Sequence, residues 1–136
     1  MGVDLHVDDE FYEIGAASFF HSFFSNIAYH LEQGKWGRNF PIIMNHLYQG
    51  ELEYDEISKA KNELLEIKRQ LCNIKPSKVI WDIEDLSLQP PWGNNISDDV
   101  TDLSNYFVTS DGRDLIEVIL EAFDYALENE SDCYIE

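Results

Sequence analysis

The sequence predicts an α+β fold, in which a small, mostly antiparallel sheet packs against about four helices. The N-terminal residues alternate between apolar and polar, which is typical of half-buried strands. Several later stretches repeat apolar residues every three or four positions, as amphipathic helices do. At 136 residues and 44% hydrophobic content, the chain can build a core without a metal or disulfide. We therefore expect residues 1–136 to form a single domain.

The N-terminal elements are predicted from short alternating patterns. Val3, Leu5 and Val7 alternate with polar residues, so residues 3–7 are expected to form a half-buried strand. A turn at residues 8–9 would lead into a returning strand over residues 11–14. The first two elements should therefore pair as a hairpin.

Three helices are expected next. Residues 17–32 carry one apolar stripe, made of Phe20, Phe23, Phe24, Ile27 and Leu31. A shorter helix is predicted from Pro41 to Gln49, since proline suits a first helical position and Gly50 can end it. A third, over residues 55–71, has the clearest helical periodicity in the chain.

The second half of the chain mixes short apolar runs with a long irregular segment. Residues 79–83 are bulky and strand-like, and residues 106–109 suggest another strand. Between them, residues 84–102 form a long loop of the kind that often carries function. A last helix is expected over residues 112–128, capped by Ser110 or Asp111, with a final strand at residues 134–135. The order of the strands does not follow from these patterns.

Negative charge is concentrated in the C-terminal part. Residues 1–78 carry twelve acids and eight bases, whereas residues 79–136 carry fifteen acids and a single base, Arg113, which gives the formal net charge of −18. Such an excess opposes compactness and attracts positively charged partners. It disfavours direct binding to nucleic acid or to an anionic membrane. A merely solvated acidic surface is the alternative.

Cysteine usage and hydropathy predict a cytoplasmic protein. Cys72 and Cys133 lie far apart in unlike contexts, which favours reduced thiols. The chain starts without the basic and apolar regions of a secretory signal, and polar residues interrupt its longest apolar stretch, residues 19–31. No cofactor is expected. The sequence has no zinc-ligand spacing, and His21 and His30 would point to opposite sides of one helix.

Two groups of acids are candidate functional sites. The first, in the strand-like run and the loop, comprises Asp82, Glu84, Asp85, Asp98, Asp99 and Asp102. Clustered carboxylates can bind Mg²⁺ in nucleases, but residues 79–112 contain no basic side chain to engage a substrate phosphate. The second is a ridge on the last helix, made of Glu117, Glu121, Asp124 and Glu128. Like charges at this spacing repel, so a basic partner would relieve the ridge, although a solvated face is equally compatible with it.

Trp92 lies in the run Pro-Pro-Trp-Gly-Asn-Asn at residues 90–95. The prolines stiffen this loop, and the residues after the tryptophan favour turn geometry. The tryptophan is either a buried anchor for the loop or an exposed aromatic of the kind that dominates binding hot spots.

Several of these segments resemble a known family. They are Lys-Val-Ile-Trp-Asp-Ile-Glu-Asp-Leu at 78–86, Gln-Pro-Pro-Trp-Gly-Asn-Asn-Ile at 89–96 and Thr-Asp-Leu-Ser-Asn-Tyr-Phe-Val-Thr-Ser at 101–110. With Phe-Tyr-Glu-Ile-Gly at 11–15 and the Phe-rich helix after it, nearly the whole chain resembles immunity protein family number seventy of bacterial polymorphic toxin systems. The resemblance implies a non-enzymatic antidote, encoded beside a toxin and binding it in the cytoplasm. It assigns no contact residue.

Charge and resemblance together give the leading hypothesis. The protein is expected to neutralise a cognate bacterial toxin, a basic nuclease-type domain, through an acidic surface. The first candidate surface combines the six acids of residues 82–102 with Trp92 as an apolar anchor, and the second is the ridge of Glu117, Glu121 and Asp124. Two alternatives stay open: a small metal-dependent hydrolase using Asp82, Glu84 and Asp85, and an acidic adaptor or nucleic-acid mimic with no toxin involved.

Overall fold

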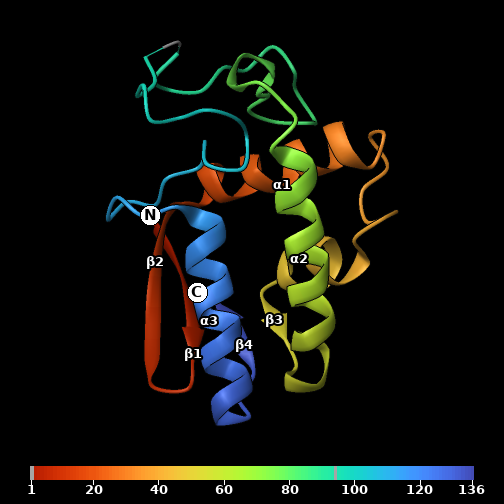
Figure 1. Ribbon diagram of the computed structural model, residues 1–136, viewed down its shortest axis with the longest axis vertical. Helices are drawn as coiled ribbons and strands as arrows, with labels where there is room; N and C mark the ends of the chain where they lie inside the picture. The colour runs from red at the N-terminus through yellow and green to blue at the C-terminus, as the bar shows by residue number, and fades with distance from the viewer. Residues whose placement is uncertain (1, 94) are drawn as a thin grey trace.

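A four-stranded antiparallel sheet of strand order β2-β1-β4-β3 is the base of the fold and confirms the predicted α+β class. The computed structural model describes residues 2–93 and 95–136 (Figure 1). The strands are β1 (Gly2–Val7), β2 (Glu10–Ala16), β3 (Glu51–Leu52) and β4 (Cys133–Ile135). The α-helices are α1 (Ala17–Leu31), α2 (Ile57–Leu71) and α3 (Leu115–Asn129). A short π-helix, η1 (Ile42–Leu47), and two single 3₁₀ turns, η2 (Tyr54–Glu56) and η3 (Pro76–Lys78), complete the described elements.

The predicted hairpin of β1 and β2 forms, and β4 pairs with β1 on its other side. Leu5, Val7 and Cys133 are fully buried on the core face of the sheet. The end of the chain thus packs into the middle of the sheet, where burial raises the pKa of the Cys133 thiol to about 12. Cys72 and Cys133 are both free. The two-residue strand β3 was not predicted, since it is too short to show a period.

One hydrophobic core lies between the sheet and the helices. Its largest fully buried side chains include Phe23 and Phe24 of α1, Phe107, and Phe123 of α3. Helices α2 and α3 lie side by side, and α1 crosses near one end of them (Figure 1). No helix within residues 2–93 and 95–136 is long and apolar enough to cross a membrane.

A buried carboxylate holds the connection between α1 and η1. Glu32 is fully buried, and its oxygens accept hydrogen bonds from the backbone N–H groups of Gly37 (3.0 Å), Asn39 (2.8 Å) and Phe40 (3.0 Å). The helix predicted over residues 41–49 is the π-helix η1. Its first N–H groups are satisfied by Glu63 of α2, which accepts from Ile43 at 2.9 Å. Side-chain carboxylates thus replace the missing helical partners.

The strand predicted over residues 79–83 is wrong. Instead of joining the sheet, the backbone of Ile80 pairs with a side chain of α1: the Asn26 amide donates to the Ile80 carbonyl at 2.8 Å, and its oxygen accepts from the Ile80 N–H at 2.9 Å. The Ser22 hydroxyl donates to the same carbonyl at 3.1 Å. An amide side chain offers a donor and an acceptor as a neighbouring strand does, so this apolar run needs no sheet.

The strand predicted over residues 106–109 is also wrong. Only Val108 forms an isolated bridge, with Asp114. Helix α3 therefore begins at Leu115, later than expected, and its cap is Asp114 rather than Ser110 or Asp111. The Asp114 carboxylate accepts from the N–H of Ile116 at 3.1 Å, as a helix N-cap does.

Candidate functional site

Residues 79–93 and 95–105, below called the segment of residues 79–105, form a long irregular stretch over one end of the molecule, above the helices in Figure 1. Hydrogen bonds to several parts of the chain hold it. One set is the Asn26 and Ser22 contact with Ile80. The Leu103 N–H also donates to the Ile74 carbonyl at 3.0 Å, and His30 Nε2 lies 2.8 Å from the carbonyl of Lys78, just before the segment. All residues of the first candidate surface lie on this segment.

Asp82 is tied to α1 through a histidine. His21 Nε2 lies 3.2 Å from Asp82 Oδ1, and His21 Nδ1 lies 2.8 Å from the Tyr48 hydroxyl. The hydrogen bond from the Glu84 N–H, together with His21, lowers the pKa of Asp82. Asp82 is therefore an ionised group that anchors the segment, and only part of its side chain is exposed.

Three of the six predicted acids share one local structure. Asp82, Asp85 and Asp102 each accept a hydrogen bond from the backbone N–H two residues further on, at 2.9, 3.1 and 2.8 Å. These are Asx turns, which aspartate favours in irregular chain. Burial opposes ionisation of Asp102, but hydrogen bonds from Ser104 and Thr101 leave its pKa lowered. These carboxylates fix the backbone of the loop and also give it negative charge.

The remaining acids of the segment are exposed. Glu84, Asp98 and Asp99 point to solvent, and none of them forms an ion pair with a lysine or arginine among residues 2–93 and 95–136. The same is true of Asp85. The segment therefore presents negative charge that the described part of the molecule leaves unneutralised.

Trp92 combines both roles considered from the sequence. Its indole N–H donates to the Tyr106 hydroxyl at 2.8 Å, and its ring meets Trp81 edge-on at a centroid distance of 5.4 Å. The side chain nevertheless stays 37% exposed. Further large apolar side chains exposed on the same segment are Leu86, Leu88 and Ile96.

Three of the four acids of the ridge on α3 form ion pairs within the molecule. Glu117 pairs with Lys68, Asp124 with Lys61 at 2.6 Å, and Glu121 with Arg113. Both lysines come from α2, which packs against α3. The repulsion expected along this ridge is thus relieved by a neighbouring helix, without an external partner.

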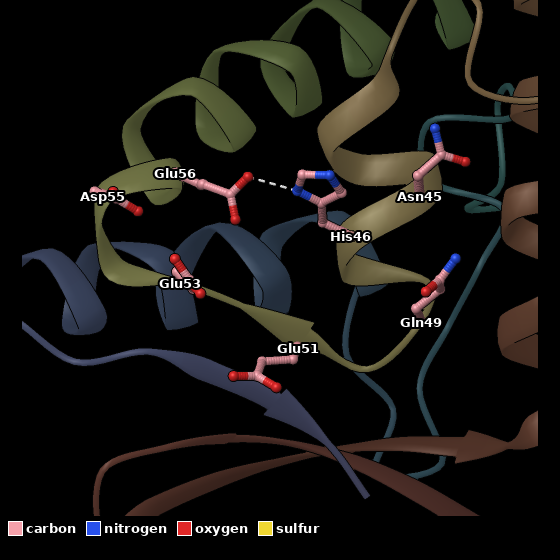
Figure 2. Close-up of a pocket in the computed structure, with 7 residues that line it drawn as sticks. All are labelled: Asn45, His46, Gln49, Glu51, Glu53, Asp55 and Glu56. Carbon is pink, nitrogen blue, oxygen red and sulfur yellow. Dashed lines mark hydrogen bonds and ion pairs between the residues drawn. The ribbon is translucent and has the colours of Figure 1, made fainter.

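The structure gathers a second acidic surface that the sequence reasoning missed. A broad pocket of about 800 Å³ is lined by Asn45, His46, Gln49, Glu51, Glu53, Asp55 and Glu56. Figure 2 shows His46 facing Glu56, with His46 Nδ1 at 2.5 Å from a Glu56 oxygen. The signal was the run of four acids in residues 51–56. It was hidden in the small net charge of the first half, where eight bases, among them Lys59, Lys61 and Lys68 of α2, offset most of the acids.

Within the part of the chain that the structure describes, two groups of side chains have ligand atoms close enough to hold a metal ion. One is His21, Asp82 and Glu84, and the other is Glu53, Asp55 and Glu56; within each, the ligand atoms lie within 4.8 Å of one another. The first group differs from the one proposed from the sequence, which was Asp82, Glu84 and Asp85, because the strand that would have aligned these three does not form. The Asp85 carboxylate instead accepts hydrogen bonds from Ser87, and His21 replaces Asp85 in the group.

A family-model match over nearly the whole chain places this small acidic α+β domain in the class of immunity proteins, which bind a cognate toxin. Residues 5–135 match the family model described as Immunity protein 70, and the chain belongs to that family. The match covers nearly the whole chain and confirms the resemblance drawn from residues 78–110. Neither a curated protein nor a solved structure matches it.

Proposed function

We propose that this protein is an antidote that binds its cognate toxin through the exposed surface of residues 82–99, and that the toxin is a basic, nuclease-type domain. Family membership supports the antidote role. The choice of surface and of toxin chemistry is supported by the charge and the exposed apolar side chains of residues 82–99.

The observation that carries the proposal is that acids without an ion-pair partner and exposed apolar side chains lie on the same segment. Glu84, Asp85, Asp98 and Asp99 lie on the same segment as Leu86, Leu88, Trp92 and Ile96. Protein interfaces combine a buried apolar or aromatic centre with a polar rim. Three of the four ridge acids on α3 are paired, and the pocket of residues 45–56 is lined by polar side chains.

A basic toxin is the partner that this surface favours. A cleft that binds nucleic acid uses lysine and arginine to hold phosphates, and an acidic protein surface can take the place of those phosphates. Opposite charge also speeds the encounter, which matters for an antidote that must act before the toxin does. Since a nuclease would act inside the producing cell, the antidote would act in the cytoplasm.

Co-expression tests the function. The toxin domain encoded next to this gene is produced in a host cell with this protein or with an empty vector. We expect growth only with the protein, and elution of the two proteins as one complex. Growth arrest in both cultures, with separate elution of the two proteins, would refute the antidote function.

The hydrolase alternative is favoured by one observation, the grouping of His21, Asp82 and Glu84. Titration with Mg²⁺ and Mn²⁺ separates it from the antidote function. A hydrolase would bind the metal tightly and lose a metal-dependent activity in Asp82→Asn. An antidote would still rescue growth in that variant, because Asp82 contributes to loop structure and charge rather than to catalysis.

A further inference from the structure

Building on the proposed function, we propose that a small apolar pocket beside the acidic segment receives one apolar side chain of the toxin, presented between lysine or arginine residues. The pocket holds about 270 Å³ and lies between α1 and the irregular segment. Its apolar and aromatic lining consists of Phe19, Trp92, Ile96, Val100, Tyr106 and Val108.

The pocket is preformed by contacts that do not depend on a partner. Phe19 of α1 packs against Phe107 at a ring distance of 5.9 Å. Tyr106 accepts the indole hydrogen bond of Trp92, which fixes the opposite wall. Ile96 and Val108 nevertheless stay 39% and 45% exposed. A rigid pocket with exposed apolar walls gains free energy when a side chain fills it, and little ordering entropy is lost.

The size and lining of the pocket indicate what fills it. Small-molecule sites usually span roughly 300–1,000 Å³ and carry a few convergent polar groups. This pocket lies below that range, and its lining residues carry no charge. It therefore suits one leucine-, isoleucine- or phenylalanine-sized side chain, as the anchors of interface hot spots do.

The charge around the pocket selects the partner. Asp98 and Asp99 directly follow the lining residue Ser97, and no lysine or arginine occurs in residues 79–112. A second copy of this protein, with its own net charge of −18, would be repelled, as would an anionic membrane. A toxin segment with basic residues on both sides of an apolar one would match both the acids and the pocket.

The acidic charge and the apolar pocket should affect different rate constants of toxin binding. Long-range attraction changes mainly the association rate, whereas buried contacts change mainly the dissociation rate. The pocket therefore predicts a kinetic signature that is distinct from the charge effect. Salt should slow association without abolishing the slow dissociation that the apolar contact provides.

The experiment uses the full chain and its cognate toxin domain in surface plasmon resonance. Ile96→Ala should speed dissociation about tenfold, which is 1.4 kcal/mol, and leave association within about twofold. Val100→Phe, which fills the pocket and removes no apolar surface, should weaken binding to a similar degree. The matched control is Leu65→Ala, on α2, where the leucine is 45% exposed and lies outside the pocket.

The outcomes separate the two proposals. If Ile96→Ala and Val100→Phe had the same dissociation rate constant as Leu65→Ala, the proposed role of the pocket would be overturned. The proposed function would still stand, provided that the wild type binds the toxin. A wild type that does not bind the toxin would overturn both. A wild-type dimer in sedimentation experiments, lost in Ile96→Ala, would assign the pocket to a second copy and overturn the inference. Thermal unfolding of each variant checks that it is folded.

Discussion

At the scale of single residues, the carboxylate of Glu32 is the group that most needs hydrogen-bond partners. It is fully buried, and no lysine, arginine or histidine pairs with it in the described part of the chain. A buried charge is costly unless hydrogen bonds satisfy it. Three backbone N–H groups do so here, and in return the carboxylate fixes the loop that joins α1 to η1.

Replacing this carboxylate should destabilise the protein. In Glu32→Gln, an NH₂ group takes the place of one oxygen and faces backbone donors that then lose their acceptor. The free energy of unfolding should fall by about 2–3 kcal/mol, as measured by urea denaturation. Glu128→Gln, on the exposed side of α3, is the matched control and should change little. If the two variants were equally stable, the carboxylate would not be holding the loop.

The individual acids also show what sequence reasoning could reach. The charge count correctly found Asp82, Asp85 and Asp102 on one segment, but it treated each carboxylate as free. Each makes an Asx turn to the residue two positions on. That preference can be recognised in a sequence, because aspartate in irregular chain bonds to nearby backbone. The His21 contact could not be predicted, since it joins positions 61 residues apart.

At the scale of elements, periodic segments were predictable and contacts between an element and a loop were not. The hairpin, the helices and the final strand follow from local patterns. Residues 79–83 have the composition of a central strand, yet their hydrogen-bonding partner is the side chain of Asn26. Nothing local distinguishes an apolar run paired with a strand from one paired with a helix side chain.

Asn26 should therefore control the order of the whole irregular segment. Asn26→Leu keeps the number and branching of the side-chain heavy atoms but removes two hydrogen bonds to Ile80, so hydrogen exchange should rise across residues 79–105 more than in α2 or α3. Its neighbour Ser25 supplies the control. The hydroxyl of Ser25 is buried and has no partner in the described structure, so Ser25→Ala should leave exchange unchanged. Equal exchange in both variants would mean that other contacts hold the segment.

At the scale of the whole molecule, the distribution of cations decides which acids remain available. Lys61 and Lys68 of α2 and Arg113 pair with three of the four ridge acids on α3. Acids without a lysine or arginine partner among the described residues consequently gather at the segment of residues 79–105, at the pocket of residues 45–56, and around Asp8, Glu130 and Asp132. The linear sequence predicted a gradient toward the C-terminal half, whereas folding gathers acids from both halves into separate surfaces.

This distribution predicts opposite effects of salt on folding and on binding. Screening reduces self-repulsion, so raising NaCl from about 50 to about 500 mM should raise the midpoint of thermal unfolding by about 4 °C. The gain should shrink when Glu51→Gln, Glu53→Gln and Asp55→Asn are combined. A midpoint that falls with salt would mean that the surface ion pairs outweigh the repulsion.

The most direct test of the proposed binding surface compares two triple variants that remove the same charge. One combines Glu84→Gln, Asp98→Asn and Asp99→Asn, and the other combines Glu51→Gln, Glu53→Gln and Asp55→Asn. The measured quantity is the rate constant of association with the cognate toxin domain at low salt. We expect the first variant to slow association about tenfold and the second less than about twofold. Equal slowing, or a larger effect of the second variant, would contradict binding through residues 82–99.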